Sequence, residues 1–208
     1  MRGLYAIIDP QSCLSAPFGV AEQILAGGCA ALQLRDKQAD DASFAALGRK
    51  LSDACRAAQV PFFVNDRFWL AAQLDAAGVH LGQGDASLAR VRRELGPERL
   101  IGISTHDLAQ ALAAAREGAD LIGFGPVFET RTKPTAEPTV GLSALARVCA
   151  EVRIPVVAIG GLTLERAPRV AQAGASMGAA ISAVCSVPDP ATAARALHAC
   201  LRARMTPA

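Results

Sequence analysis

The sequence lacks the features that mark membrane, secreted and nucleic-acid-binding proteins. No apolar run approaches the roughly 18 residues that a membrane-spanning helix needs, although 51% of the 208 residues are hydrophobic. The formal net charge is only +2, so no strong field attracts nucleic acid or an anionic membrane. Asp9 and Pro10 interrupt the first apolar stretch before a signal-peptide core could form. We therefore expect a cytoplasmic protein without nucleic-acid or membrane partners, and a homo-oligomer is compatible with the sequence.

The cysteines show no C-x-x-C spacing, which argues against a redox motif or a zinc site of the common types. Six of them are scattered along the chain: Cys13, Cys29, Cys55, Cys149, Cys185 and Cys200. In a cytoplasmic protein such cysteines are typically reduced thiols that pack as small apolar side chains. We expect that behaviour for all six.

Short β-rich runs alternate with alanine-rich stretches whose apolar residues recur every three or four positions, as in 43–59 and 107–119. The runs are continuously apolar, which is typical of parallel strands covered by helices. We expect eight strands, over 4–9, 31–36, 61–66, 78–82, 100–105, 120–125, 155–161 and 176–182.

Eight strand–helix units in one chain predict a closed (β/α)8 TIM barrel, an α/β fold. The alternative is a doubly wound open sheet, which usually carries G-x-G-x-x-G after its first strand, whereas here that strand ends IIDPQS. No linker or low-complexity segment interrupts the pattern. We expect a single domain over 1–208, ending in a last helix and a short tail after about residue 203.

Polar residues follow nearly every predicted strand, where active sites of barrels lie. In the segment QLRDK, alternation along a strand lets Gln33, Arg35 and Lys37 share one direction. A guanidinium and an ammonium held together indicate an anion with several oxygens, such as a pyrophosphate. The alternative is a solvated run of charges at an edge.

Two carboxylates end neighbouring predicted strands, Asp66 and Asp85. Such a pair can hold a hard divalent cation, most simply Mg²⁺ completed by water and phosphate oxygens. Asn65 could add an oxygen ligand or bind phosphate. The alternative is that each aspartate caps the following helix.

Gly160-Gly161 ends a predicted strand and, in our interpretation, opens a helix, so that backbone N–H groups could bind a phosphate. Ser182, at the end of the last predicted strand, is placed to help. Two anion sites on one rim would suit two phosphorylated substrates that are joined with loss of pyrophosphate. The long polar loop 125–142, with Thr130, Thr132 and Lys133, lies between them as a potential lid.

The motifs QLRDK, VNDR, HLGQGD, GISTH, GPVFETRTK, VGL, AIGG and ISA occur in that order. This series resembles the thiamine phosphate synthase family over most of the chain. The resemblance implies a (β/α)8 barrel and an Mg²⁺-dependent transferase. Its substrates would be 4-amino-5-hydroxymethyl-2-methylpyrimidine diphosphate and 4-methyl-5-(2-phosphoethyl)thiazole, and its products thiamine monophosphate and pyrophosphate.

The resemblance also implies residue roles. Gln33, Arg35, Lys37 and Asn65 would hold the pyrimidine diphosphate, Asp66 and Asp85 would bind Mg²⁺, and Ser104 would lie by the pyrimidine. Thr130, Thr132, Gly161, Ile181 and Ser182 would form the thiazole phosphate site, and Lys133 would contact the diphosphate. Lys133, Arg35 and Ser104 are the expected catalytic residues.

One segment departs from the family pattern. Ser176 and Met177 stand where the family usually has an acidic residue and a glycine, which bears on packing near the thiazole. His106 could serve as a base or simply bond to the backbone. The alternatives to a synthase are the related thiazole tautomerase, with a base at the place of His106, and a non-catalytic barrel that binds a phosphorylated ligand.

Overall fold

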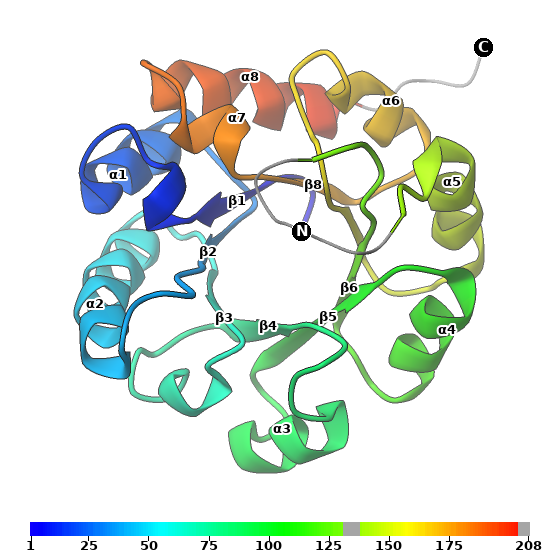
Figure 1. Ribbon diagram of the computed structural model, residues 1–208, viewed down its shortest axis with the longest axis horizontal. Helices are drawn as coiled ribbons and strands as arrows, with labels where there is room; N and C mark the ends of the chain where they lie inside the picture. The colour runs from blue at the N-terminus through cyan, green and yellow to red at the C-terminus, as the bar shows by residue number, and fades with distance from the viewer. Residues whose placement is uncertain (131–137, 204–208) are drawn as a thin grey trace.

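The computed structural model describes residues 1–130 and 138–203. Its strands pair in parallel in sequence order and close into a barrel, with the first strand pairing the last (Figure 1). The strands are β1 (Gly3–Ile8), β2 (Ala31–Leu34), β3 (Phe62–Asn65), β4 (Gly78–Leu81), β5 (Leu100–Thr105), β6 (Leu121–Phe124), β7 (Val156–Ala158) and β8 (Met177–Ala180). The predicted (β/α)8 barrel is confirmed, and the open sheet is wrong.

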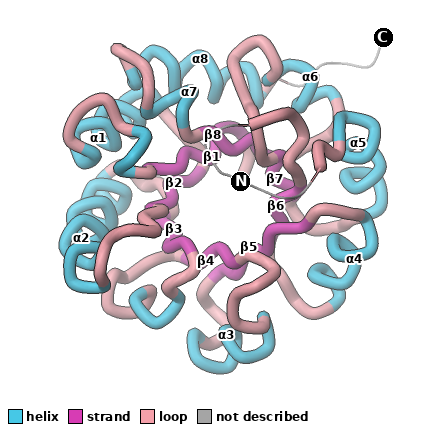
Figure 2. The backbone as a smooth tube through the Cα atoms, viewed as in Figure 1, coloured by secondary structure: helices cyan, strands magenta, loops and turns pink. Residues whose placement is uncertain are grey.

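Helices form a ring outside the strands (Figure 2). They are α1 (Pro17–Gly27), α2 (Asp41–Ala57), α3 (Leu88–Leu95), α4 (Leu108–Arg116), α5 (Gly141–Glu151), α6 (Ala167–Gln172), α7 (Ser182–Cys185) and α8 (Pro190–Arg202), with 3-10 turns η1 (Pro10–Ser12) and η2 (Phe68–Leu70). Side-chain caps fix several starts: Asp40, Asp107 and Asp189 each accept a hydrogen bond from a backbone N–H of the first turn. None of the helices in the described ranges is long and apolar enough to cross a bilayer.

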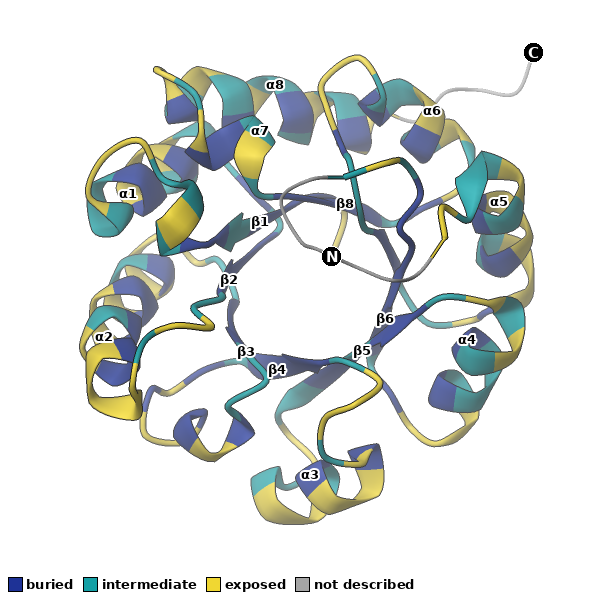
Figure 3. Cartoon of the chain, in the orientation of Figure 1, coloured by how far each residue is buried: buried dark blue, intermediate teal, exposed yellow. Residues whose placement is uncertain are grey.

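Two apolar layers hold the barrel together, one between the strands and the helices and one inside the ring of strands. Figure 3 shows the strands as mostly buried segments. The inner layer consists of Tyr5, Ala31, Phe63, Leu121, Val157, Met177 and Ala179, all buried. These residues fill the lower interior, as side chains do in barrels of eight strands. Among the described residues, this layer fills the interior at the amino ends of the strands, and the cavity opens at the rim where the strands end.

Glycines on β5 and β6 make room for the imidazole ring of His80 inside the barrel. A Cβ on Gly102 would lie 2.6 Å from His80 Nδ1, and one on Gly123 would lie 3.1 Å from His80 Cε1. The imidazole of β4 thus occupies space that side chains on β5 and β6 would otherwise fill. The glycines are required by this close approach of the imidazole to β5 and β6.

Several strands end earlier than the sequence predicts. β2 stops at Leu34, so Arg35 and Lys37 belong to the loop that follows it. The backbone N–H of Arg35 still donates to Ile8 O at 2.9 Å, which keeps that loop on the wall of the barrel. The expectation that a helix opens directly at Gly161 is wrong, because α6 begins only at Ala167.

Candidate functional site

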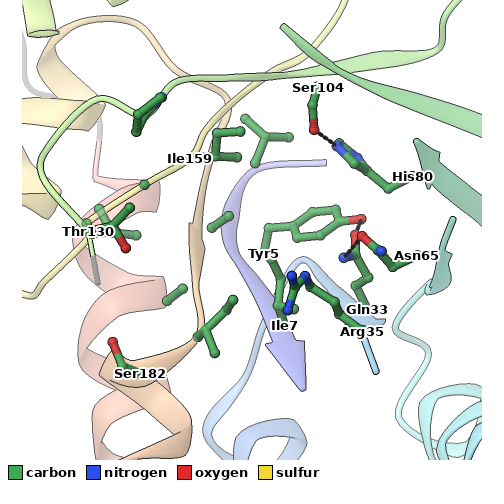
Figure 4. Close-up of a pocket in the computed structure, with 18 of the residues that line it drawn as sticks. Tyr5, Ile7, Gln33, Arg35, Asn65, His80, Ser104, Thr130, Ile159 and Ser182 are labelled. Atoms are coloured by element: carbon green, nitrogen blue, oxygen red, sulfur yellow. Dashed lines mark hydrogen bonds between the residues drawn. The ribbon is translucent and has the colours of Figure 1, made fainter. Parts of the chain in front are cut away.

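A cavity of about 130 Å³ opens at the carboxyl ends of the strands. An engineered core cavity of ~150 Å³ holds benzene, so this space has room for an aromatic ring. Figure 4 shows Thr130 and Ser182 on one side and Gln33 with Asn65 on the other. The lining residues are Tyr5, Ile7, Gln33, Arg35, Asn65, His80, Ser104, His106, Pro126, Thr130, Val157, Ile159, Gly160, Gly161, Leu162, Ala179, Ala180, Ile181 and Ser182.

A chain of hydrogen bonds orients the amides on the floor of the cavity. Tyr5 Oη donates to Gln33 Oε1 at 2.9 Å, and Gln33 Nε2 donates to Asn65 Oδ1 at 3.0 Å (Figure 4). Burial raises the pKa of the Tyr5 hydroxyl well above its ordinary value, so it stays a donor. Since Asn65 Oδ1 accepts from Gln33, the Asn65 side chain retains its two N–H donors for other partners.

Arg35 is held at the cavity wall by an ion pair with Asp9 at the end of β1. Its side chain is 15% exposed and that of Asp9 is 8% exposed, so both charges are largely withdrawn from water. A guanidinium has five donors, and the ion pair with Asp9 leaves others for an anion. Asp9 thus positions Arg35, a role that sequence reasoning missed although Asp9 also ends a strand.

Lys37, Asp66 and Asp85 form a charged group on the rim outside the cavity. Lys37 Nζ pairs with Asp66, whose backbone N–H donates to His80 O at 2.9 Å, and Asp85 Oδ2 accepts from Gly82 N at 2.6 Å. Burial raises the pKa of the Asp66 carboxyl above its ordinary value, the neighbouring Asp85 carboxyl adds to the rise, and Lys37 opposes it. Asp66 does not cap a helix.

Two carboxylates close enough to disfavour each other's charge are a set that fits a hard cation. No cluster of three or more His, Cys, Asp or Glu side chains occurs within 1–130 and 138–203, so a cation at Asp66 and Asp85 would need further oxygens from water or substrate. The donor set therefore suits Mg²⁺ with phosphate oxygens better than a metal that is caged by protein side chains.

Two histidines line the cavity, each with a defined partner. His80 Nε2 lies 3.0 Å from Ser104 Oγ, within the buried interior. His106 Nδ1 lies 2.6 Å from Gly125 O, and because a carbonyl can only accept, Nδ1 carries the proton. Of the two alternatives for His106, the bond to the backbone is present, and in the neutral ring Nε2 is then the basic nitrogen.

The start of the loop after β6 is fastened to the end of β7. Val127 N donates to Ile159 O at 2.8 Å, and Phe128 N donates to Gly160 O at 3.2 Å. These bonds place Thr130 beside Gly160 and Gly161 on the cavity wall. Thr132 and Lys133, which the sequence assigns to the second phosphate and to the diphosphate, lie outside the described residues.

Gly161→Ala is expected to lower Tm by roughly 5–10 °C, because the site combines a left-handed backbone with a close approach. Gly161 has φ +66°, and a Cβ there would lie 2.4 Å from Glu129 O. Calorimetry of the purified variant measures the shift.

Gly118→Ala is the matched control for this variant. Gly118 has φ +94° with open space around it, so its substitution carries the backbone strain alone and should lower Tm by only about 2–5 °C. Equal shifts for the two variants would show that the contact with Glu129 O is irrelevant.

The last two residues predicted for the second anion site also lie at the cavity. Ile181 and Ser182 line the cavity where β8 passes into α7. Met177, at the other end of β8, is fully buried in the inner apolar layer and does not line the cavity. The departure from the family pattern at Ser176 and Met177 therefore lies in the barrel floor and away from the ligand space.

The structure brings most of the predicted site residues to one mouth. Gln33, Arg35, Asn65, Ser104, Thr130, Gly161, Ile181 and Ser182 line the cavity, and Lys37, Asp66 and Asp85 gather at its rim. Sequence reasoning did not assign Tyr5, Asp9 or His80 to the site. The alternation of inward positions along β1 and β4 could have indicated Tyr5 and His80.

The family model described as thiamine monophosphate synthase matches residues 4–184. The chain belongs to the thiamine monophosphate synthase family. A thiamine-phosphate synthase of Roseiflexus castenholzii is 46% identical over 86% of this chain and 78% of its own length. A thiamine phosphate pyrophosphorylase of Pyrococcus furiosus superposes with a TM-score of 0.88 at 34% identity, covering 96% of this chain and 95% of that one.

The family also includes longer proteins. A thiamine biosynthesis bifunctional protein of Geobacter sulfurreducens is 44% identical over 93% of this chain, which spans only 39% of that protein's length. The family membership confirms the resemblance inferred from the motif series. It also agrees with the fold, since the Pyrococcus protein matches the barrel over nearly its whole length.

Proposed function

We propose that the chain is a thiamine-phosphate synthase, a transferase acting on the pyrimidine diphosphate and thiazole phosphate named above. It would form thiamine monophosphate and release pyrophosphate. The observation that carries the proposal is a cavity with room for an aromatic ring and with phosphate-binding chemistry on both sides, in a chain of this family. Arg35 and the amide donors lie on one side, and Thr130 and Ser182 lie on the other (Figure 4).

The diphosphate side is built to stabilise a leaving group. Arg35, fixed by Asp9, presents donors to the departing oxygens, and Lys37 adds a second positive charge at the rim. Preorganised donors act most strongly where they need not move as charge develops. Lys133 is proposed to complete this set from the loop after β6.

Asp66 and Asp85 would hold Mg²⁺ at this rim. When bound, the ion supplies positive charge that stabilises the negative oxygens of pyrophosphate. Lys37 forms an ion pair with Asp66 in the structure. When Mg²⁺ neutralises the Asp66 carboxylate in its place, the Lys37 ammonium is released and can turn towards a phosphate. Mg²⁺ dependence is accordingly part of the proposal.

The rest of the cavity surrounds the methylene carbon of the pyrimidine, which loses pyrophosphate and then bonds to the thiazole nitrogen. Loss of pyrophosphate leaves a pyrimidinylmethyl cation, which water would convert to the alcohol. Tyr5, Ile7, Val157 and Ile159 give the cavity walls with few polar atoms, and the packed floor admits no water from below. The thiazole nitrogen attacks with its own lone pair, so the reaction needs no general base.

Pyrophosphate release from the purified protein tests the proposed function. With both substrates and Mg²⁺ we expect turnover, and omission of either substrate or of Mg²⁺ should abolish it. Binding of both phosphorylated molecules without release would support the non-catalytic barrel instead. Proton exchange or isomerisation of a thiazole without pyrophosphate release would support the tautomerase.

His106→Asn is expected to change kcat for pyrophosphate release by less than about fivefold, because no general base is required. The asparagine amide can still donate to Gly125 O, so the local structure is retained. Steady-state kinetics at saturating substrates measure the change. A loss of about 100-fold or more, the usual effect of removing a general base, would contradict this assignment and favour the isomerase.

A further inference from the structure

Two cysteines meet where the barrel closes. Cys13 lies in the loop that follows β1, and Cys185 ends α7, which follows β8. β1 and β8 are the first and last strands and pair along the closing seam of the barrel. Figure 1 shows α7, in orange, beside the dark blue segment after β1.

The backbones on both sides of this pair are tied together. Leu14 N donates to Cys185 O at 3.2 Å, and Ser186 Oγ donates to Ser12 O at 2.7 Å. The neighbours of Cys13 are thus bonded to Cys185 and to its neighbour. A disulfide requires Cα atoms within about 4.4–6.8 Å. These cross-bonds hold the two segments side by side.

The two thiols are close enough to interact, and they differ in acidity. The interaction with the neighbouring Cys185 thiol lowers the pKa of Cys13, against the opposing effects of burial and of Asp9. The same contact, together with burial, raises the pKa of Cys185. Cys13 is half-buried and Cys185 fully buried, so a reagent reaches Cys13 first.

We propose that Cys13 and Cys185 are an oxidative modification site, at which a peroxide joins them in a reversible disulfide that staples the β1–β8 seam. The Cys13 thiolate attacks one peroxide oxygen, which gives a sulfenic acid and hydroxide. The Cys185 sulfur then displaces the sulfenic hydroxyl, which leaves as water with the Cys185 proton. Overall, two thiols and one hydrogen peroxide give one disulfide and two waters.

Another pair of cysteines provides an internal contrast. Cys29 and Cys55 are near enough for Cys29 to influence the Cys55 thiol, but both are buried. Burial raises the pKa of each to about 12, so neither supplies a thiolate at neutral pH. Proximity alone therefore does not make an oxidisable pair, and the half-exposed, activated thiol is what distinguishes Cys13.

The staple has a large expected effect on stability because it closes a loop of about 170 residues. Cross-linking the two ends of the barrel restricts the unfolded chain over nearly its whole length. We expect Tm to rise by roughly 5–10 °C on oxidation, and dithiothreitol should reverse the rise.

The experiment treats the full reduced chain with a small excess of hydrogen peroxide under native conditions. Intact mass should fall by about 2 Da, and a tryptic digest should contain peptide 3–35 joined to peptide 170–195. Cys13→Ser and Cys185→Ser should each abolish both the linkage and the rise in Tm. Cys200→Ser, at another half-buried thiol, should retain them.

The result that overturns the proposal is stable addition of about 16 or 32 Da to Cys13 with no loss of 2 Da. A linkage that persists in Cys13→Ser would overturn it equally, because Cys29 lies on the same tryptic peptide. Serine is close in size to cysteine, and the Cys13 side chain is only half-buried. Cys13→Ser should therefore fold and give an interpretable result even if Cys185→Ser folds poorly.

Discussion

Arg35→Ala is expected to lower kcat/KM for pyrophosphate release by roughly 10²–10³-fold, the usual effect of removing a preorganised donor to developing charge. The same variant should lose stability, because the Asp9 side chain, only 8% exposed, is left as an unpaired carboxylate. Steady-state kinetics and thermal unfolding measure the two effects separately.

A double variant separates the catalytic effect from the structural one. Asp9→Asn with Arg35→Gln removes both charges of the buried pair and retains a polar side chain at each position. We expect this variant to recover most of the stability lost in Arg35→Ala and little of the activity. Recovery of activity together with stability would mean that Arg35 acts only through folding and does not bind the diphosphate.

The fold could be predicted because the apolar runs, the helical periodicity and the polar strand ends all indicate the same barrel. Eight apolar runs separated by helical stretches define the barrel, and no competing pattern is present. The ends of strands and helices were predicted less well. The strand β2 stops at Leu34, and the helix α6 begins only at Ala167. Hydrophobicity marks where a segment is buried, whereas the last residues of a strand are decided by hydrogen bonds that the sequence does not display.

The site was predicted where side-chain chemistry is visible in a local motif, as in QLRDK. It was missed where a role depends on a partner distant in the chain. Asp9 acquires its role from Arg35, in the loop that follows the neighbouring strand β2. His80 lines the cavity only because Gly102 and Gly123 leave space for its ring. Such complementarity between strands is a property of the packed barrel, and no short segment contains it.

The rim carboxylates lead to an unusual combination of effects. Asp66→Asn is expected to lower kcat by about 100-fold or more at millimolar Mg²⁺, because a ligand of the proposed ion is lost. The same change should leave Tm in metal-free buffer equal to or slightly above that of the unaltered protein. Asp66 has φ +59°, a conformation that asparagine tolerates at least as well as aspartate, so the substitution adds no backbone strain.

The sign of the stability effect follows from the raised pKa of Asp66. The folded protein holds this proton more tightly than the unfolded chain, so the carboxyl lowers stability as pH rises from the unfolded pKa through the folded one. At neutral pH and without metal, the charged form is the disfavoured one, and asparagine removes that cost. The ion pair with Lys37 opposes this, but Lys37 is 55% exposed and an ion pair there contributes little.

Mg²⁺ should therefore raise Tm of the unaltered protein and have a much smaller effect on Asp66→Asn, since binding to the folded form alone stabilises it. Asp53→Asn, an exposed acid on α2, is the control and should leave the Mg²⁺ response intact. Thermal unfolding with and without Mg²⁺, in the presence of pyrophosphate, measures both. An unchanged Mg²⁺ response in Asp66→Asn would remove Asp66 from the metal site, and a large fall in Tm without metal would mean that Asp66 is a structural residue.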